Sequence, residues 1–247
     1  MSQTLSTVLP EAARETLPEA LIAEVRALGA ALPLATAAFD ADGTLWRDDI
    51  GEDFLQHLCA RGWVKLPGGG DPYTEYLMRV ERDRATGFAY AAQLLQGLAE
   101  SALQEECERF AKEWVPRRLL ASTQALLALC SEAGLVCAVV SASPIQIVRA
   151  AAALAGVPAA RCFGMTTQAD AAGVLTDRLV PPITHAAGKV EALAKAGLGA
   201  PVLGCGDSVQ GDLAMLEAAR VRVVVAQGPG GALAEEARRR GWTILSY

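Results

Sequence analysis

The stretch AAFDADGTLW, from Ala37 to Trp46, sets two aspartates one residue apart at the end of an apolar run. Asp40 and Asp42 are followed at once by Gly43 and Thr44, and the Asp-Gly pair favours a turn where the strand stops. Two carboxylates this close repel each other by roughly 4 kcal/mol at an effective dielectric near 20. We therefore expect a positive charge beside them.

Apolar runs rich in β-branched residues alternate along the chain with helical stretches rich in Ala, Leu and Glu. Strands are expected at residues 34–39, 135–140, 201–206 and 221–226, with two shorter ones near 161–166 and 242–247. Near-continuous apolar strands between helices are typical of a parallel sheet that is buried on both faces. We predict an α/β fold with a doubly wound parallel sheet.

One long segment breaks this alternation. Between the first two strands the pattern is helical, with no convincing strand and a turn at PGGGDP, residues 67–72. We predict a helical cap domain at 48–115, inserted directly after the first core strand as a lid over it. Residues 1–47 and 116–247 are assigned to an α/β core. Within this part, residues 1–33 are expected to form a helical extension packed on the outside.

Composition and charge exclude several classes of protein. The chain has 247 residues, 52% of them hydrophobic, and its net charge of −6 argues against a nucleic acid or an anionic membrane as partner. The six cysteines form no C-x-x-C pair, which favours reduced core thiols. The beginning lacks the pattern of a secretory signal, and no apolar run reaches membrane-spanning length. We expect a cytoplasmic protein, either a monomer or a homodimer.

Polar groups also follow two later strands. SASP occupies residues 141–144, GDSVQGD occupies residues 206–212, and Lys189 in HAAGKVEAL opens a helix. Ligands of open parallel sheets bind outside the carboxyl ends of the strands, so we expect these groups to meet Asp40 and Asp42 in one crevice.

The chemistry of this set points to phosphoryl transfer. Asp40, Asp42, Asp207 and Asp212 offer the oxygen ligands that Mg²⁺ prefers, and the ion would relieve the repulsion between them. Ser141 offers a hydroxyl, backbone N–H groups at the following helix can face an anion, and a lysine adds a compact charge. Such sites work through positioning and electrostatics.

Several of these residues also have ordinary structural interpretations. Ser143 is expected to cap the helix that follows, with Pro144 at its first position, while Ser141 remains the ligand. Lys189 could be a solvated helix lysine, and Asp212 a capping acid near a helix start. The two histidines, His57 and His185, lack metal-ligand spacing and are taken as structural or surface residues.

Four motifs in order carry a family resemblance. FDADGTLW resembles the first motif, D-x-D-G-T, of the haloacid dehalogenase superfamily; VVSAS resembles its second, GKVEAL its third and GDSVQGD its fourth. They extend from Phe39 to Asp212. The helical insert and the third motif are most similar to the phosphoserine-phosphatase-like branch.

The resemblance implies a Rossmann-like core and a Mg²⁺-dependent phosphatase that acts on a small phosphomonoester. Asp40 would be the nucleophile that forms an aspartyl-phosphate, and Asp42 the general acid and base. Lys189 would offset the charge of Asp40. The implied phosphate-binding residues are Ser141, Ala142, Lys189, Gly43 and Thr44, and the implied metal-binding residues are Asp40, Asp42, Asp207 and Asp212.

The substrate is less well marked. Phosphoserine phosphatases carry a glutamate shortly after the first motif, and Asp49 aligns with it best. They also use a cap arginine, for which Arg79, Arg82 and Arg84 are the candidates. A phosphotransferase or phosphomutase using the same intermediate stays open as an alternative. A 2-haloacid dehalogenase is disfavoured by Asp42, and a non-catalytic binding protein by the retained nucleophile and lysine.

Overall fold

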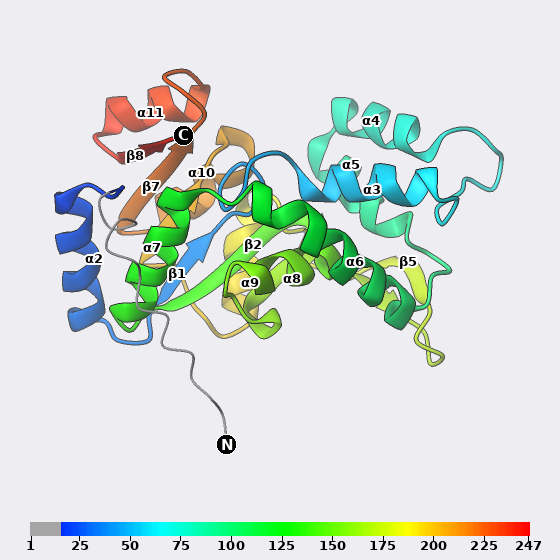
Figure 1. Cartoon of the computed structure of the whole chain (residues 1–247), viewed down its shortest axis with the longest axis horizontal. Helices are drawn as coiled ribbons and strands as arrows, with labels where there is room; N and C mark the ends of the chain where they lie inside the picture. Colours follow the sequence, from blue (N-terminus) through cyan, green and yellow to red (C-terminus); the bar gives the residue numbers. More distant parts are fainter. Residues whose placement is uncertain (1–15) are drawn as a thin grey trace.

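The computed structural model describes residues 16–247, and a six-stranded parallel sheet runs through its centre (Figure 1). The strand order is β3-β2-β1-β6-β7-β8, so β1 lies in the interior between β2 and β6. The strands are β1 (Thr36–Phe39), β2 (Val136–Pro144), β3 (Cys162–Met165), β6 (Leu203–Gly206), β7 (Val221–Ala226) and β8 (Thr243–Ser246). The predicted fold class is confirmed.

Side chains alternate between the two faces of the sheet, as the pleat requires. Phe39 packs in the largest core cluster together with α7 (Ala121–Glu132) and α8 (Ile145–Leu154). Ala38 points the opposite way, toward α9 (Ala187–Lys195) and α10 (Val209–Ala218). The N-terminal helix α2 (Glu19–Ala31) lies against α7, and α11 (Ala232–Arg240) packs on β7 and β8. Helices therefore cover both faces.

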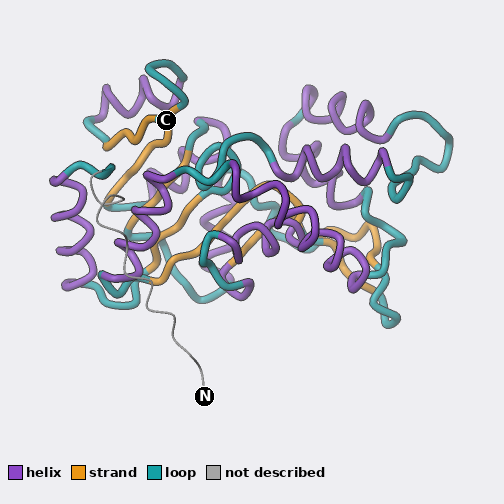
Figure 2. Tube along the Cα trace, in the orientation of Figure 1, coloured by secondary structure: helices purple, strands orange, loops and turns teal. Residues whose placement is uncertain are grey.

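Four helices follow β1 in the sequence before the core helix α7, which directly precedes β2. They are α3 (Ile50–Ala60), α4 (Pro72–Arg82), α5 (Arg84–Gln93) and α6 (Glu100–Trp114), and α3, α4 and α5 gather at one end of the molecule (Figures 1 and 2). The side chains of Asp49, Asp71 and Asp83 cap the first three of them, accepting backbone N–H groups of the first turn. The short 3-10 helix η1 (Val115–Arg117) follows α6, which packs along α8.

The elements differ from the sequence-based expectation in three places. The helical pattern at residues 88–114 is two helices, α5 and α6, joined by a turn. A short antiparallel hairpin of β4 (Thr167–Ala169) and β5 (Leu175–Leu179) was not predicted, and a second 3-10 helix, η2 (Ala159–Arg161), precedes β3. Strand β2 runs on to Pro144 instead of ending at Val140.

The expected extension at 1–33 is partly observed. Helix α2 covers its second half, and residues 1–15 lie outside the described residues. The boundaries assigned to the cap and core stay a prediction. All six cysteines lie in the described part and are free thiols. Within residues 16–247, no helix is both long and apolar enough to cross a bilayer.

Candidate active site

The carboxyl ends of β1 and β6 bring the first and fourth motifs side by side. The backbone N–H of Asp40 donates to the carbonyl of Cys205 over 2.9 Å, which continues the ladder between the two strands past Phe39. Asp207 follows directly after β6, and Asp212 lies in the first turn of α10. The neighbouring strands thus place three carboxyl groups together, as the sequence predicts.

Lys189 lies between two of these carboxylates and is almost fully buried. Its Nζ donates to Asp212 Oδ1 over 2.6 Å and also to Asp40 Oδ1. Burial disfavours the charged lysine, but Asp212 and Asp40 outweigh this and raise the pKa of Lys189 above its usual value. The solvated-helix interpretation of this lysine is wrong, because its side chain is the centre of a buried ion network.

Asp212 is held from both sides. Its Oδ2 accepts the backbone N–H groups of Asp207 and Ser208 over 3.1 and 2.9 Å and the Ser208 hydroxyl over 3.0 Å. Burial raises the pKa of Asp212, but Lys189 and these donors lower it below its ordinary value. Asp212 therefore anchors Lys189. The capping of α10 belongs to the Ser208 hydroxyl, which accepts the N–H of Gly211.

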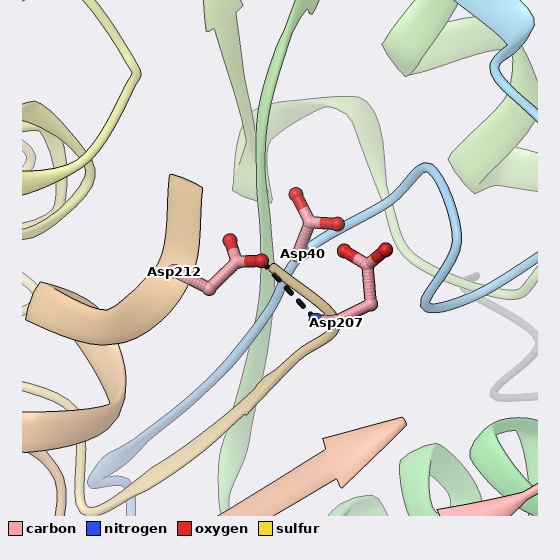
Figure 3. A group of neighbouring side chains, drawn as sticks. All are labelled: Asp40, Asp207 and Asp212. Carbon is pink, nitrogen blue, oxygen red and sulfur yellow. Dashed lines mark hydrogen bonds between the residues drawn. The ribbon is translucent and has the colours of Figure 1, made fainter. Parts of the chain in front are cut away.

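Asp40 and Asp207 lie in a group where one lysine faces three acids. Burial and the negative charge of Asp212 raise the pKa of Asp40 to about 7, and burial and Asp40 raise the pKa of Asp207 to about 9. Oxygen atoms of Asp40, Asp207 and Asp212 lie within 4.8 Å of one another, and Figure 3 shows the carboxyl groups of Asp40 and Asp207 side by side. Because one lysine cannot balance the charge of three carboxylates, a further cation would be favoured at this position.

Gly43 allows Asp207 to come this close. Its φ of +75° belongs to the left-handed region, and a Cβ there would lie 2.4 Å from Asp207 Oδ2. The turn after β1 thus presses its backbone against a carboxylate of the fourth motif. The donor set of hard oxygens and its excess negative charge fit a divalent cation such as Mg²⁺.

The carboxylate of Asp42 is turned away from this cluster and receives four hydrogen bonds. Its Oδ1 accepts Trp46 Nε1 over 2.9 Å and the backbone N–H of Ile50 over 2.8 Å. Its Oδ2 accepts the hydroxyls of Ser141 over 3.2 Å and Ser143 over 2.8 Å. The side chain of Asp42 is therefore absent from the three-acid group, and a metal ligand from Asp42 would be its backbone carbonyl, as the family resemblance implies.

The expectation that Ser143 caps the following helix is wrong. Helix α8 begins at Ile145 after Pro144 and has no side-chain cap, and Ser143 lies inside β2 with its hydroxyl on Asp42. The Ser141 hydroxyl, expected to face a phosphate, also contacts Asp42 and accepts the Ser143 N–H over 3.0 Å. Both hydroxyls are used to hold the second aspartate.

A cavity of about 180 Å³ lies over the strand ends, beneath α3, α4 and α5. Asp40, Lys189 and Asp207 form its polar end. The residues around the rest of its wall are Asp42, Asp49, Gly51, Glu52, Tyr76, Arg84, Phe88, Ala91, Ala142, Ser143, Pro144, His185, Ser208 and Gly211. Its small volume suits a small molecule with one charged end.

Not every predicted ligand residue lines this cavity. Ala142 does, but Ser141 is fully buried behind it. Thr44 is also fully buried, and its hydroxyl has no hydrogen-bond partner among residues 16–247. Gly43 lines a neighbouring hollow on the other side of Asp207.

The residues predicted to bind the substrate also divide into those that line the cavity and those that do not. Asp49 lines the cavity at the start of α3, and burial and Asp42 raise its pKa well above the usual value. Of the three arginines, Arg84 lines the cavity at the start of α5. Arg79 instead pairs with Glu75 at 2.7 Å and stacks on Tyr90, and Arg82 is exposed elsewhere on α4.

Several residues of the cavity wall were not assigned to the site from the sequence, and two of them, His185 and Glu52, are titratable. His185 lies four residues before Lys189 and packs against Phe88, with ring centroids 5.6 Å apart. Burial and the nearby Lys189 lower its pKa. Glu52 lies one helical turn after Asp49 and accepts the hydroxyl of Tyr73. The sequence offers only one indication for His185 and Glu52, which is that each lies close to a residue already assigned to the site. Neither belongs to a recognisable motif.

Comparison with known proteins agrees with this geometry. A family model described as haloacid dehalogenase-like hydrolase matches residues 37–217, about three quarters of the chain. No curated protein matches the sequence.

Known structures share the fold at low sequence identity. A protein of unknown function from Bordetella pertussis Tohama I is 23% identical, with a TM-score of 0.71 over 86% of this chain and 98% of that one. A phosphoserine phosphohydrolase-like protein from Francisella tularensis is 16% identical, with a TM-score of 0.55 over 85% and 94%. A substrate-bound phosphoserine phosphatase is 17% identical, with a TM-score of 0.53 over 82% and 90%.

Proposed function

The chain belongs to the haloacid dehalogenase-like hydrolase family, and from this premise we propose that it is a Mg²⁺-dependent phosphatase of a small phosphomonoester. One observation carries the proposal. A buried lysine holds the carboxylate of Asp40 at the end of a cavity, next to the unneutralised Asp207. That arrangement supplies a nucleophile, a phosphate-binding charge and a place for a cation in one small space.

The first step uses Asp40 as the nucleophile. A carboxylate oxygen of Asp40 attacks phosphorus, the bond from phosphorus to the ester oxygen breaks, and Asp42 gives its proton to the departing alcohol. Lys189 favours the ionised form of Asp40 against the effect of burial and faces the phosphoryl oxygens. The end of β2, with Ala142 in the cavity wall and α8 beginning just beyond, adds the positive end of a helix dipole.

The second step returns the enzyme to its starting state. Asp42, now a carboxylate, takes a proton from water, and the resulting hydroxide oxygen attacks phosphorus of the aspartyl-phosphate. The bond between Asp40 and phosphorus breaks, which releases inorganic phosphate and restores the carboxylate. The proton on Asp42 is then available for the next ester.

Asp40, Asp207 and the backbone after β1 would hold Mg²⁺, with Asp212 supporting both Lys189 and the loop that carries Asp207. Bound there, the ion supplies positive charge against the phosphoryl oxygens and against the carboxylates. The fit rests on the oxygen donors and on the raised pKa values of Asp40 and Asp207, which mark a site that is short of positive charge.

A panel of phosphate esters tests the proposal. The purified protein is assayed for phosphate release from amino acid, sugar and aromatic phosphomonoesters, with Mg²⁺ and with a chelator. We expect turnover of at least one ester class and its loss on chelation. Turnover of 2-haloacids alone would favour a dehalogenase, and transfer of phosphate to an added alcohol in place of water would favour a phosphotransferase.

A further inference from the structure

Ser143 occupies an unusual position between the cavity and Asp42. Its hydroxyl donates to Asp42 Oδ2 over 2.8 Å, and Ser143 is one of the residues that line the cavity. Ser141 reaches the same oxygen over 3.2 Å, but it is fully buried and does not line the cavity. Of the two hydroxyls, Ser143 is therefore the one on the substrate side of Asp42.

The opposite wall fixes where the Ser143 hydroxyl can lie. A Cβ on Gly51, at the start of α3, would lie 2.3 Å from Ser143 Oγ and 2.7 Å from its Cβ. Gly51 has a helical backbone and no positive φ, so any residue could adopt its conformation. Glycine is needed there because a larger residue would collide with Ser143. The close backbone of α3 leaves the hydroxyl directed at Asp42.

The other two donors to Asp42 come from the same helix start and from the preceding loop. Ile50 N–H and Trp46 Nε1 occupy Oδ1 and leave Oδ2 to the serines. With both oxygens engaged, the carboxyl group cannot rotate freely about its Cβ–Cγ bond. Its Oδ2 is the oxygen that accepts the hydroxyl of Ser143, a residue of the cavity wall.

We propose that Ser143, held in place by Gly51, is a positioning residue that aims Asp42 Oδ2 at the leaving oxygen of the substrate. The inference rests on the phosphatase function proposed above. In the first step the O–H bond of protonated Asp42 breaks and the proton moves to the ester oxygen; the Ser143 hydroxyl keeps its own proton and fixes the direction of transfer. Loss of Ser143 should therefore slow only reactions that need this proton.

The test compares two esters that differ in this need. A nitrophenyl phosphate releases a stable anion and needs little protonation, whereas glycerol phosphate releases an alkoxide and needs a proton in the transition state. Both are assayed with Mg²⁺ on wild type, Ser143→Ala and Gly51→Ala. Alanine is the better helix former, so Gly51→Ala displaces the hydroxyl without weakening α3. Thr123→Val removes a buried hydroxyl that bonds Leu120 away from the cavity and is the matched control.

For both test variants we expect kcat on glycerol phosphate to fall about 10- to 100-fold, and kcat on the nitrophenyl ester less than about 3-fold. Thr123→Val should leave the ratio of the two rates at the wild-type value. Equal losses on both esters, or no loss on either, would overturn the role of Ser143 while leaving the phosphatase function intact. Wild type that hydrolyses neither these two esters nor any ester of the panel described above would overturn the proposed function and this inference with it.

Discussion

Two groups of charged side chains, each built around at least one buried acid, differ in the proportion of acidic to basic residues. In the first, Glu106 of α6 receives hydrogen bonds from Arg61 over 2.9 Å and from Arg109, and its Oε1 lies 2.5 Å from His57 Nε2. Hydrogen bonding by Arg109 is the main cause that lowers the pKa of Glu106 to about 2. One buried acid thus has three basic neighbours.

In the second group the proportion is reversed. Asp40, Asp207 and Asp212 share one cation of the chain, Lys189, and the pKa values of Asp40 and Asp207 are raised to about 7 and about 9. The acids Glu106 and Asp40 are both buried, but Arg61 and Arg109 reach solvent, whereas Lys189 is itself buried. Glu106 thus has several basic neighbours within the chain, whereas the acids at the strand ends outnumber their basic partner, and this excess of acid supports the cation site proposed there.

The largest effect expected from this difference is on catalysis. Asp40→Asn removes the nucleophile and should reduce kcat/KM by at least about 1,000-fold, measured as phosphate release with Mg²⁺. Glu106→Gln is the matched control, since it neutralises an equally buried acid in the other group, and it should keep wild-type kcat/KM at a temperature where it is folded. Comparable losses in both variants would erase the contrast between the two groups.

Lys189→Met should cause the largest loss of stability. It leaves the buried acids Asp40 and Asp212 without their cation, at an expected cost of about 3–5 kcal/mol in the free energy of unfolding, measured by urea denaturation without metal. Adding Asp212→Asn to this variant should restore part of the loss, because the uncompensated charge is then smaller. A Lys189→Met protein as stable as wild type would show that the ion network contributes nothing to folding.

Glu106→Gln should also destabilise the protein, but by about 1–3 kcal/mol, because the replacement keeps its shape and some of its hydrogen bonds. The pKa of Glu106 is lower in the folded state, so its contribution is present above its ordinary pKa of 4.5 and is lost as the pH falls toward 2. The stability difference between wild type and Glu106→Gln should therefore shrink from pH 6 to pH 3. A constant difference would mean that packing, and not charge, is what the substitution removes.

The sequence predicts the second group much better than the first. Asp40 and Asp207 directly follow apolar strands, and the rule that parallel strand ends meet at one edge is enough to bring them together. Glu106 lies 49 residues after His57 in the sequence, and the packing of α6 against α3 brings the two together. No local sequence pattern encodes this contact. The β4–β5 hairpin was missed because its strands are short and partly exposed.

Ser143 shows a different limit. A serine before proline is typical of a helix start, and helix α8 does begin two residues later. The same serine lies at the end of a strand that runs longer than its apolar run, so its hydroxyl faces Asp42 instead of the helix N–H groups. Only the relative position of β2 and the loop after β1 distinguishes the two outcomes.

The smallest expected effect concerns the pH dependence of the metal-free protein. The pKa values of Asp40 and Asp207 are higher in the folded chain than their ordinary value of 3.8, so between pH 5 and pH 9 the folded state holds protons that the unfolded state has already released. Stability without metal should therefore fall as the pH rises over this range. A fall of about 1 kcal/mol corresponds to about 2–4 °C in Tm for a chain of this size.

Mg²⁺ should reverse this trend, because it binds the deprotonated carboxylates and competes with protons for them. The rise in Tm on adding Mg²⁺ should be larger at pH 8 than at pH 6, as measured by differential scanning calorimetry. In Asp207→Asn both the alkaline loss of stability and the response to Mg²⁺ should be reduced, whereas Glu106→Gln should keep both. An equal Mg²⁺ response in Asp207→Asn and wild type would mean that the ion binds elsewhere, and the excess of acid at the strand ends would then need another partner.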